Sequence, residues 1–217
     1  MVALLAAVRQ QVGDRTADAP VSGYDRWRVK PMQLMDVLRN RRAVREYTDA
    51  RIEKPTVDRL INAAIWAPSA MNLQPWAFAA LLDPQRLHEY GKRAKEWLLA
   101  NFSWTPFEPR LQEMVRDPHF IMFYHAPALI MVLAKSSEAQ AMEDCCLAAQ
   151  NLMLAARDEG IGTCWIGLAR PWLDLPSTKT ELRMPRDYRV VAPVILGYPN
   201  VWPESHGRTP PEIYWIT

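Results

Sequence analysis

The sequence predicts an α+β domain in which helices surround a small mixed β-sheet. Segments with helical spacing outnumber the short apolar runs of strand length, and the two kinds alternate irregularly along the 217 residues. This length is enough for one large domain with its own core. Hydrophobic residues make up 49% of the chain and charged residues 23%, a composition that excludes a disordered chain, collagen and a coiled coil.

The first 31 residues predict an arm outside the main domain, which we place at residues 32–217. Leu4, Leu5, Val8 and Val12 have helical spacing and indicate an amphipathic helix that must cover an apolar surface. The same apolar run imitates a signal peptide only in part, because no basic residue precedes it. Residues 13–31 are polar and interrupted by Gly and Pro, as in an extended connection.

Proline positions mark helix starts in the first half of the main domain. Pro55 and Pro84 each suit the first turn of a helix, where the missing N–H is not needed. In chain order we expect a helix from 32–38, a helix from 55 to Pro68, a strand at 76–82, a helix at 84–99, and an irregular, proline-containing lid candidate at 103–119.

The second half predicts two more strands and a central helix. The helix at 138–159 ends at Gly160, and its second half is apolar on nearly every side, so it belongs in the core or in a dimer interface. Strands are expected at 128–134 and near 190–197, with an irregular polar stretch after residue 167 and a proline-rich tail at the end.

The composition limits which binding partners and which cellular compartment we expect for the protein. The 26 Lys+Arg nearly cancel the 24 Asp+Glu, so the chain has no large positive field for nucleic acid. No run approaches the ~18 apolar residues that span a bilayer. Three cysteines, two of them adjacent, give no disulfide framework, so we expect a soluble, cytoplasmic protein. Nine Trp suit either a site for a flat ring or ordinary packing and interfaces.

Several common catalytic signatures are absent. No G-x-G-x-x-G opens a helix, and Leu168-Ala169 follow Gly167 where a P-loop needs Lys-Ser/Thr. The four histidines lack metal spacing, so no metal site is expected. No G-x-S-x-G nucleophile elbow is present.

Four patches of sequence remain as candidates for a functional site, and each has a simpler structural explanation when it is taken alone. Arg41-Arg42-Ala43-Val44-Arg45 is either a set of cations at a helix end or an anion clamp. Residues 68–76 (PSAMNLQPW) form either a turn or a stiff loop whose amides suit a heteroaromatic edge. Residues 160–167 (GIGTCWIG) form either a helix cap and a strand or a backbone that a flat ligand can approach. Arg208 is either a surface residue or a phosphate ligand.

In this order, the patches resemble the FMN-dependent nitroreductase family over residues 32–208. The similar segments are MQLMDVLRNRRAVREY, APSAMNLQPW, CLAAQNLMLAARDEGIGTCWIG and VILGYP. The resemblance implies an intertwined α+β homodimer with FMN at the subunit interface. It also implies reduction by NADH or NADPH and reoxidation by a nitroaromatic, quinone or related acceptor in a ping-pong cycle.

The resemblance also implies a role for each patch. Arg41, Arg42, Ala43 and Arg45 would grip the phosphate, ribityl chain and pyrimidine edge, with Arg208 on the phosphate. Ala43 stands where the family usually has Ser, so one hydroxyl contact is absent. Pro68, Ser69, Ala70 and Asn72 would reach the flavin from the partner subunit, and the backbone at Ile166 and Gly167 would face its N5/O4 side. No catalytic side chain is expected, because hydride transfer belongs to flavin N5.

The alternative functions differ mainly in what they require of the residues in the lid. Trp97, Phe102, Trp104 and Phe107 could stack over the ring and select planar acceptors, although packing explains Trp97 as well. A reductive dehalogenase would need Glu89, Tyr90 and Lys92 or Lys95 grouped to hold a zwitterion, and a flavin-cleaving enzyme would share the same flavin motifs. A non-catalytic flavin-binding protein and a flavin-free interaction module are the other classes.

Overall fold

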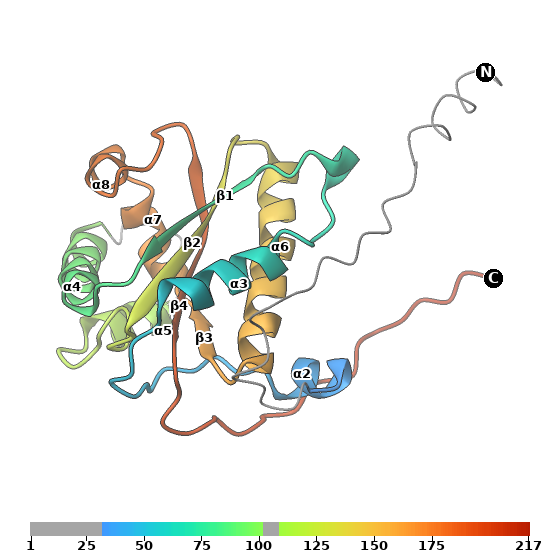
Figure 1. Ribbon diagram of the computed structural model, residues 1–217. Helices are drawn as coiled ribbons and strands as arrows, with labels where there is room; N and C mark the ends of the chain where they lie inside the picture. The colour runs from blue at the N-terminus through green and yellow to red at the C-terminus, as the bar shows by residue number, and fades with distance from the viewer. Residues whose placement is uncertain (1–31, 102–108) are drawn as a thin grey trace, which may run out of the picture. The chain divides into compact units, whose positions relative to one another are not determined.

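The computed structural model describes residues 32–101 and 109–217, which are built on a four-stranded sheet (Figure 1). The strands follow the spatial order β1-β2-β4-β3, with β1 at Trp76–Leu81, β2 at Ala128–Ala134, β3 at Gly162–Trp165 and β4 at Arg189–Gly197. All three ladders are antiparallel, so the expectation of a mixed sheet was wrong. Apolar runs indicate burial but not strand direction, and the parallel pairing of Ala43 with Thr163 is an isolated bridge.

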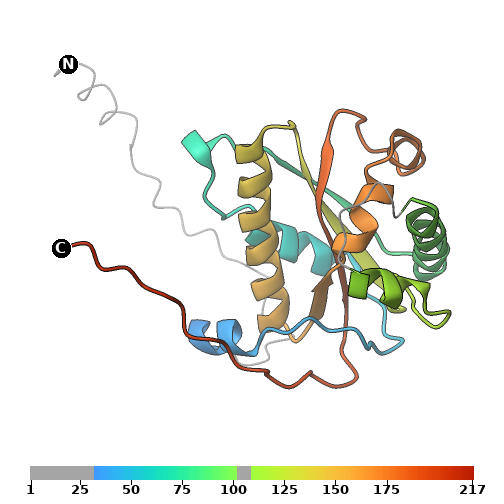
Figure 2. The same ribbon diagram turned by 180° about the vertical axis from the view of Figure 1, so that it is seen from behind.

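Helices cover both faces of this sheet (Figures 1 and 2). Helices α3 and α6 pack on one face, and α4, α5 and α7 pack on the other. The bounds are α2 Leu34–Asn40, α3 Lys54–Ala64, α4 Pro84–Ala100, α5 Pro109–Arg116, α6 Ala139–Asp158, α7 Arg170–Leu173 and α8 Pro176–Glu181, with short 3-10 turns η1 at Ala70–Asn72 and η3 at Gly167–Ala169. The expected long helices and apolar strands are therefore confirmed.

Two segments expected to be irregular contain helices instead. Pro109 and Pro176 are the first residues of α5 and α8, and Pro171 is the second residue of α7. These prolines therefore start helices and do not break them. Such short helices depend on tertiary packing, as the fully buried Val115 and Leu173 show.

Strand β2 is buried on both faces and separates two apolar clusters. Ile130 and Val132 point toward α3 and α6, whereas Leu129, Met131 and Leu133 join the cluster under α4 and α7. This alternation is the two-residue period of a strand, and burial of both faces explains its continuous apolar sequence.

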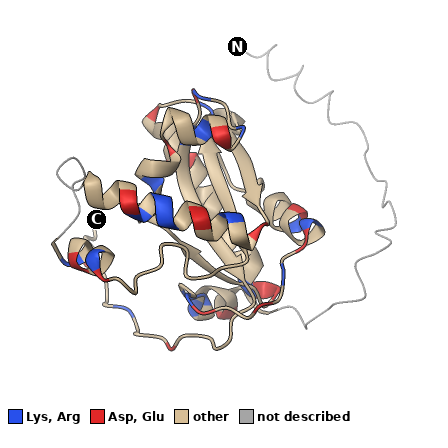
Figure 3. Cartoon of the chain, turned by 90° about the vertical axis from the view of Figure 1, so that its left-hand side faces the viewer, with Lys and Arg blue, Asp and Glu red and all other residues tan. Residues whose placement is uncertain are grey.

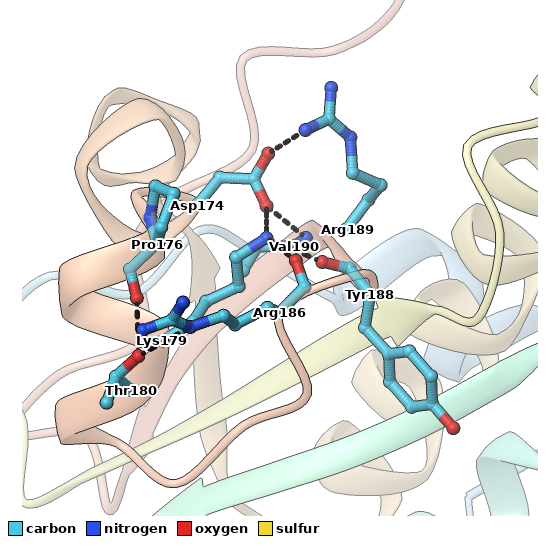
Figure 4. A network of polar contacts seen from close by, with 8 residues as sticks. All are labelled: Asp174, Pro176, Lys179, Thr180, Arg186, Tyr188, Arg189 and Val190. Carbon is cyan, nitrogen blue, oxygen red and sulfur yellow. Dashed lines mark hydrogen bonds and ion pairs between the residues drawn. The ribbon is translucent and has the colours of Figure 1, made fainter.

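A buried lysine joins the α7–α8 region to the start of β4 (Figure 4). The side chain of Lys179 is 3% exposed and donates to Asp174 Oδ1 at 3.3 Å, the Arg186 carbonyl at 2.7 Å and the Tyr188 carbonyl at 2.8 Å. Asp174 also accepts from the Val190 N–H at 3.1 Å. The ammonium group thus has three partners, as a buried charge requires.

Some expectations concern residues outside the described ranges. These are the N-terminal arm at 1–31 and the lid aromatics Phe102, Trp104 and Phe107. Among the helices in the described ranges, none has the length and apolar character needed to cross a membrane.

Candidate functional site

The arginine segment leaves the helix where a binding loop would begin. The Arg41 N–H closes α2 by donating to the Val37 carbonyl at 2.9 Å, while Arg41 itself is extended, with φ −63° and ψ 130°. Arg42 Nη1 donates to the carbonyls of Arg39 and Arg41 at 2.6 and 2.8 Å. Arg42 therefore does satisfy helix-end carbonyls, as the simpler hypothesis predicted, but Arg41 has an extended backbone and Arg45 lies beyond the helix.

Strand β3 holds this segment in place. The Val44 N–H donates to the Thr163 carbonyl at 2.9 Å, beside the bridge between Ala43 and Thr163. Val44 is fully buried, and a Cβ added to Gly162 would lie 2.7–2.8 Å from the Val44 side chain. Glycine at position 162 is therefore what allows the arginine segment to lie against residues 160–167.

Gly162→Ala should lower the free energy of unfolding by about 1–3 kcal/mol, because the new methyl group overlaps the Val44 side chain. Val44→Ala removes the overlapping methyl groups and provides the matched second variant. In urea unfolding, the double variant should be about 1 kcal/mol more stable than the two single effects predict. Strictly additive effects would show that the Val44 contact is not what excludes a side chain at position 162.

The end of β3 opens onto free space. The Ile166 N–H donates to the Pro193 carbonyl at 2.8 Å, and the Ile166 carbonyl accepts from the Ala169 N–H at 3.1 Å. A Cβ added to Gly167 meets no atom within 4 Å. The Gly167 carbonyl also has an internal partner, the Arg170 N–H, but the side of Gly167 where a Cβ would stand is open to a ligand.

Arg45 and Arg41 lie near this strand end. The Arg45 guanidinium carbon is 5.7 Å from the centre of the Tyr124 ring, within range of a cation–π contact. Burial raises the pKa of the Cys164 thiol in β3, and the charges of Arg45 and Arg41 oppose this rise. The two guanidinium groups thus contribute a positive potential beside residues 164–167.

A cluster of cations without acidic partners forms around Arg41. Burial lowers the pKa of Arg41, and the nearby charges of Arg208 and Arg42 lower it further. None of these three arginines forms an ion pair with a carboxylate within residues 32–101 and 109–217. Guanidinium groups gathered in this way, with unused donors, suit the phosphate of a flavin mononucleotide.

Sequence reasoning missed one member of this basic region. Arg157, in the last turn of α6, has its pKa lowered by burial and by Arg42. The Nε atoms of Arg42 and Arg157 are buried without a hydrogen-bond partner in the described chain. In the sequence, Arg157 looks like an ordinary cation at a helix end, so only its position in the fold reveals the association.

The loop at residues 68–76 has a strained backbone near the start of α6. Met71, Asn72 and Gln74 have positive φ angles of 50°, 56° and 49°. The Ala70 N–H donates to Oδ2 of the buried Asp144 at 3.2 Å, and the Gln74 N–H donates to Ser69 Oγ at 3.0 Å. Left-handed non-glycine residues are costly and cluster at functional sites, so this loop is a binding candidate in its own right.

The loop and the arginine segment lie at opposite ends of α6 (Figure 1). Asp144 holds the loop, whereas Asp158 accepts from the Met32 N–H at 2.8 Å, just before α2. These two anchors are about 20 Å apart along the helix axis. Within one chain, Pro68, Ser69, Ala70 and Asn72 therefore do not join the arginines in a single pocket.

The residues considered for a dehalogenase have separate partners. Glu89 pairs with Lys92 at 3.3 Å, and Lys95 Nζ donates to the Asp117 and Phe120 carbonyls at 2.7 and 2.9 Å. Tyr90 is buried. Of this set, Glu89 and Lys92 are therefore paired with each other, whereas Lys95 is held by backbone carbonyl groups. Trp97 of α4 packs against the apolar cluster, as the simpler explanation held.

A cavity of about 640 Å³ lies elsewhere, lined mostly by residues of α4. Figure 3 shows that α4 carries both Lys or Arg and Asp or Glu residues along its length. The arginines of the cavity have partners: Arg93 donates to both carboxylate oxygens of Glu181 at 2.8 Å, and Arg86 donates to the Tyr90 hydroxyl at 2.8 Å. None of the predicted flavin-site residues lines it. Across the described residues, no group of three or more His, Cys, Asp or Glu side chains could hold a metal.

Fold and site together define a class: an α+β protein with an anion-accepting arginine loop beside an open, glycine-containing strand end. The model of the Nitroreductase family matches residues 38–198, and the chain belongs to that family.

Relatives and solved structures agree with this assignment. The chain is 27% identical to nitrobenzene nitroreductase of Ectopseudomonas oleovorans, over 78% of this chain and 88% of that protein. It is 28% identical to iodotyrosine deiodinase of Thermotoga neapolitana, over 77% and 89%. The structure of a Bacteroides fragilis nitroreductase with bound FMN superposes with a TM-score of 0.73 at 27% identity, covering 86% of this chain and all of that one.

Proposed function

We propose that the protein is an FMN-dependent oxidoreductase that takes hydride from NADH or NADPH and passes it to a nitroaromatic, quinone or related acceptor by a ping-pong mechanism. The observation that carries the proposal is the arginine cluster, which has no acidic partner in the described part of the chain, beside the open backbone at Gly167. The FMN in the Bacteroides fragilis structure supports it. An Archaeoglobus fulgidus relative, 28% identical over 77% of this chain and 86% of its own, has the provisional name NADH dehydrogenase/NAD(P)H nitroreductase.

In this proposal, each segment of the flavin site has a role in binding or orienting the ligand. Arg41 and Arg208 hold the phosphate, with Arg42 beside them, and the extended backbone at Ala43 contacts the ligand without a side-chain hydroxyl. Gly167 lets the ring approach the end of β3 closely. When bound, the flavin supplies the hydride chemistry at N5, so the protein contributes orientation and electrostatics.

A homodimer would complete the site. The loop at 68–76 cannot reach the arginine cluster of its own chain, but a second copy can supply it. Exposed apolar side chains are available for such an interface: Leu34, Met35 and Leu38 of α2, Trp66 after α3, Met71 and Leu73 of the loop, and Leu147 of α6. We propose that residues 32–217 form this flavin-binding unit, with residues 1–31 as an extension.

A mixture of two damaged chains tests the shared site. Arg41→Ala removes a residue from one half of the site, and Asn72→Ala removes a residue from the other half. Neither homodimer should turn over NAD(P)H efficiently. The mixture refolded from equal amounts of the two variants should regain about a quarter of the wild-type activity, because about half of its dimers are heterodimers and each of these has one undamaged site out of two. If the mixture stays as inactive as its parts, both halves of the site come from one chain.

Anaerobic titration tests the proposed reaction. The FMN-loaded protein should lose its visible absorbance when NADH or NADPH is added and regain it with a quinone or nitroaromatic acceptor. Parallel lines in a double-reciprocal plot would support the ping-pong order. A flavin that neither nucleotide reduces would indicate a non-catalytic flavin-binding protein.

Arg45→Ala should lower the reduction potential of the bound flavin by about 30–60 mV, because the nearby positive charge stabilises the negative charge gained on reduction. Arg45→Lys keeps the charge and is the matched control. The midpoint potential should fall in the alanine variant and stay nearly constant in the lysine variant. If both variants and the wild type have the same midpoint potential, Arg45 does not lie at the edge of the flavin ring.

A reductive dehalogenase is the second candidate, because the Thermotoga neapolitana relative is named iodotyrosine deiodinase. The ion pair of Glu89 with Lys92 supplies part of the charged group that a zwitterionic substrate needs, whereas Lys95 is held by the Asp117 carbonyl. Release of iodide from 3-iodotyrosine by the reduced protein, at a rate matching that of nitroaromatic turnover, would favour this candidate over the first.

A further inference from the structure

A stacked pair joins the end of α6 to the C-terminal tail. The guanidinium carbon of Arg157 lies 3.6 Å from the centre of the Trp202 ring, well inside the range of a cation–π contact. Residues 201–217 are exposed except Trp202, which is half-buried. Trp202 is thus the packed side chain of a segment that also carries Arg208.

The neighbours of Arg157 in sequence have other partners. Asp158 accepts from the Met32 N–H at 2.8 Å, and Glu159 pairs with Arg59 at 2.7 Å. Within residues 32–101 and 109–217, Arg157 therefore forms no ion pair with a carboxylate, and the charge that acts on it most is that of Arg42. A cation at a helix C-terminus is favourable by itself, but this does not explain why a second guanidinium is placed beside it.

Two buried donors remain unused in this arrangement. The Nε atoms of Arg42 and Arg157 have no hydrogen-bond partner in the described chain. Buried guanidinium N–H groups are normally paired, because an unpaired charged donor costs more than a neutral one. Neighbouring cations with unused donors fit a missing anion, and a phosphate monoester offers several acceptor oxygens.

We infer that Arg157 is an additional phosphate-binding residue of the flavin site, and that Trp202 positions it by stacking on its guanidinium group. This inference rests on the proposed function, since it adds to the phosphate contacts of Arg41 and Arg208. The stack fixes the plane of Arg157 and holds the tail segment that leads to Arg208. The ligand chemistry is a phosphate monoester, which both FMN and NADPH contain.

The test compares ligands with and without the phosphate. Dissociation constants for FMN and riboflavin are measured by fluorescence titration of the full-length apoprotein. Arg157→Gln should weaken FMN binding about 10- to 100-fold and change riboflavin binding less than about twofold, because a charge-assisted contact to phosphate is lost. Arg86→Gln is the matched control: this arginine also lies over an aromatic ring, at 5.6 Å from that of Tyr90, but on α4.

Variants of Trp202 test its positioning role separately. Trp202→Leu should weaken FMN binding about 3- to 10-fold, and Trp202→Phe should restore most of the loss. The double variant Arg157→Gln/Trp202→Leu should bind FMN no more weakly than Arg157→Gln alone, within about twofold, because the ring acts through the guanidinium.

Several results would overturn the inference. Equal weakening of FMN and riboflavin in Arg157→Gln would make the residue structural. If Arg157→Gln leaves the FMN affinity unchanged and raises the KM for NADPH but not for NADH, Arg157 binds the phosphate of NADPH instead. Failure of the proposed function is separate, because it would appear in the wild-type protein itself, which would then either bind no flavin or bind a flavin that neither nucleotide reduces.

Discussion

Arg208→Ala should weaken FMN binding by about 10- to 150-fold while leaving riboflavin binding nearly unchanged, because it removes a charge-assisted contact to the phosphate. Arg208 is exposed, and its side chain donates a local hydrogen bond from Nη1 to the Gly207 carbonyl at 2.6 Å. Its charge lowers the pKa of Arg41, so the two guanidinium groups already act on one another without a ligand. Binding a phosphate would relieve this repulsion.

The control for Arg208 is Arg208→Lys, which keeps the charge but loses the forked geometry. It should bind FMN with an affinity between those of the wild type and the alanine variant. The measurement is the ratio of FMN to riboflavin dissociation constants in all three proteins. Should the alanine variant weaken both flavins equally, Arg208 contacts another part of the ligand or supports the fold of the tail.

Lys179→Met should lower the free energy of unfolding by about 3–5 kcal/mol, because it leaves the Arg186 and Tyr188 carbonyl groups without their buried donor and removes one of the two cations that pair with Asp174. For a chain of this size, that corresponds to a fall in Tm of roughly 6–20 °C. Methionine keeps much of the length of the side chain, so a cavity contributes little to the loss.

Lys92→Met is the matched control for Lys179. Lys92 also forms an ion pair, with Glu89 at 3.3 Å, but both side chains are more than half exposed. Its loss should change stability by less than about 1 kcal/mol. If urea or thermal unfolding gives the same small change for both variants, the network in Figure 4 does not stabilise the junction of α7, α8 and β4.

Much of the fold could be predicted because burial leaves a pattern in the sequence. The continuous apolar run at 128–134 identifies β2, and the apolar second half of α6 identifies the central helix. Helices α5 and α8 were missed because prolines at helix starts resemble the prolines of irregular segments. Strand direction was also missed, since it depends on the path between strands.

The local path of the arginine segment was predictable, because it depends on sequence spacing. Three arginines within five residues cannot all point one way on a helix, and the chain does leave α2 at Arg41. The partners contributed by distant segments could not be predicted. The stacking of Arg157 on Trp202 and the burial of Lys179 both depend on tertiary contacts for which a single sequence offers no periodic signal.

The flavin content of the purified full-length protein tests the central claim most directly. The account predicts a yellow protein whose absorption spectrum and extracted cofactor give one FMN per subunit, bound in a homodimer. A colourless protein that also fails to take up added FMN would contradict it.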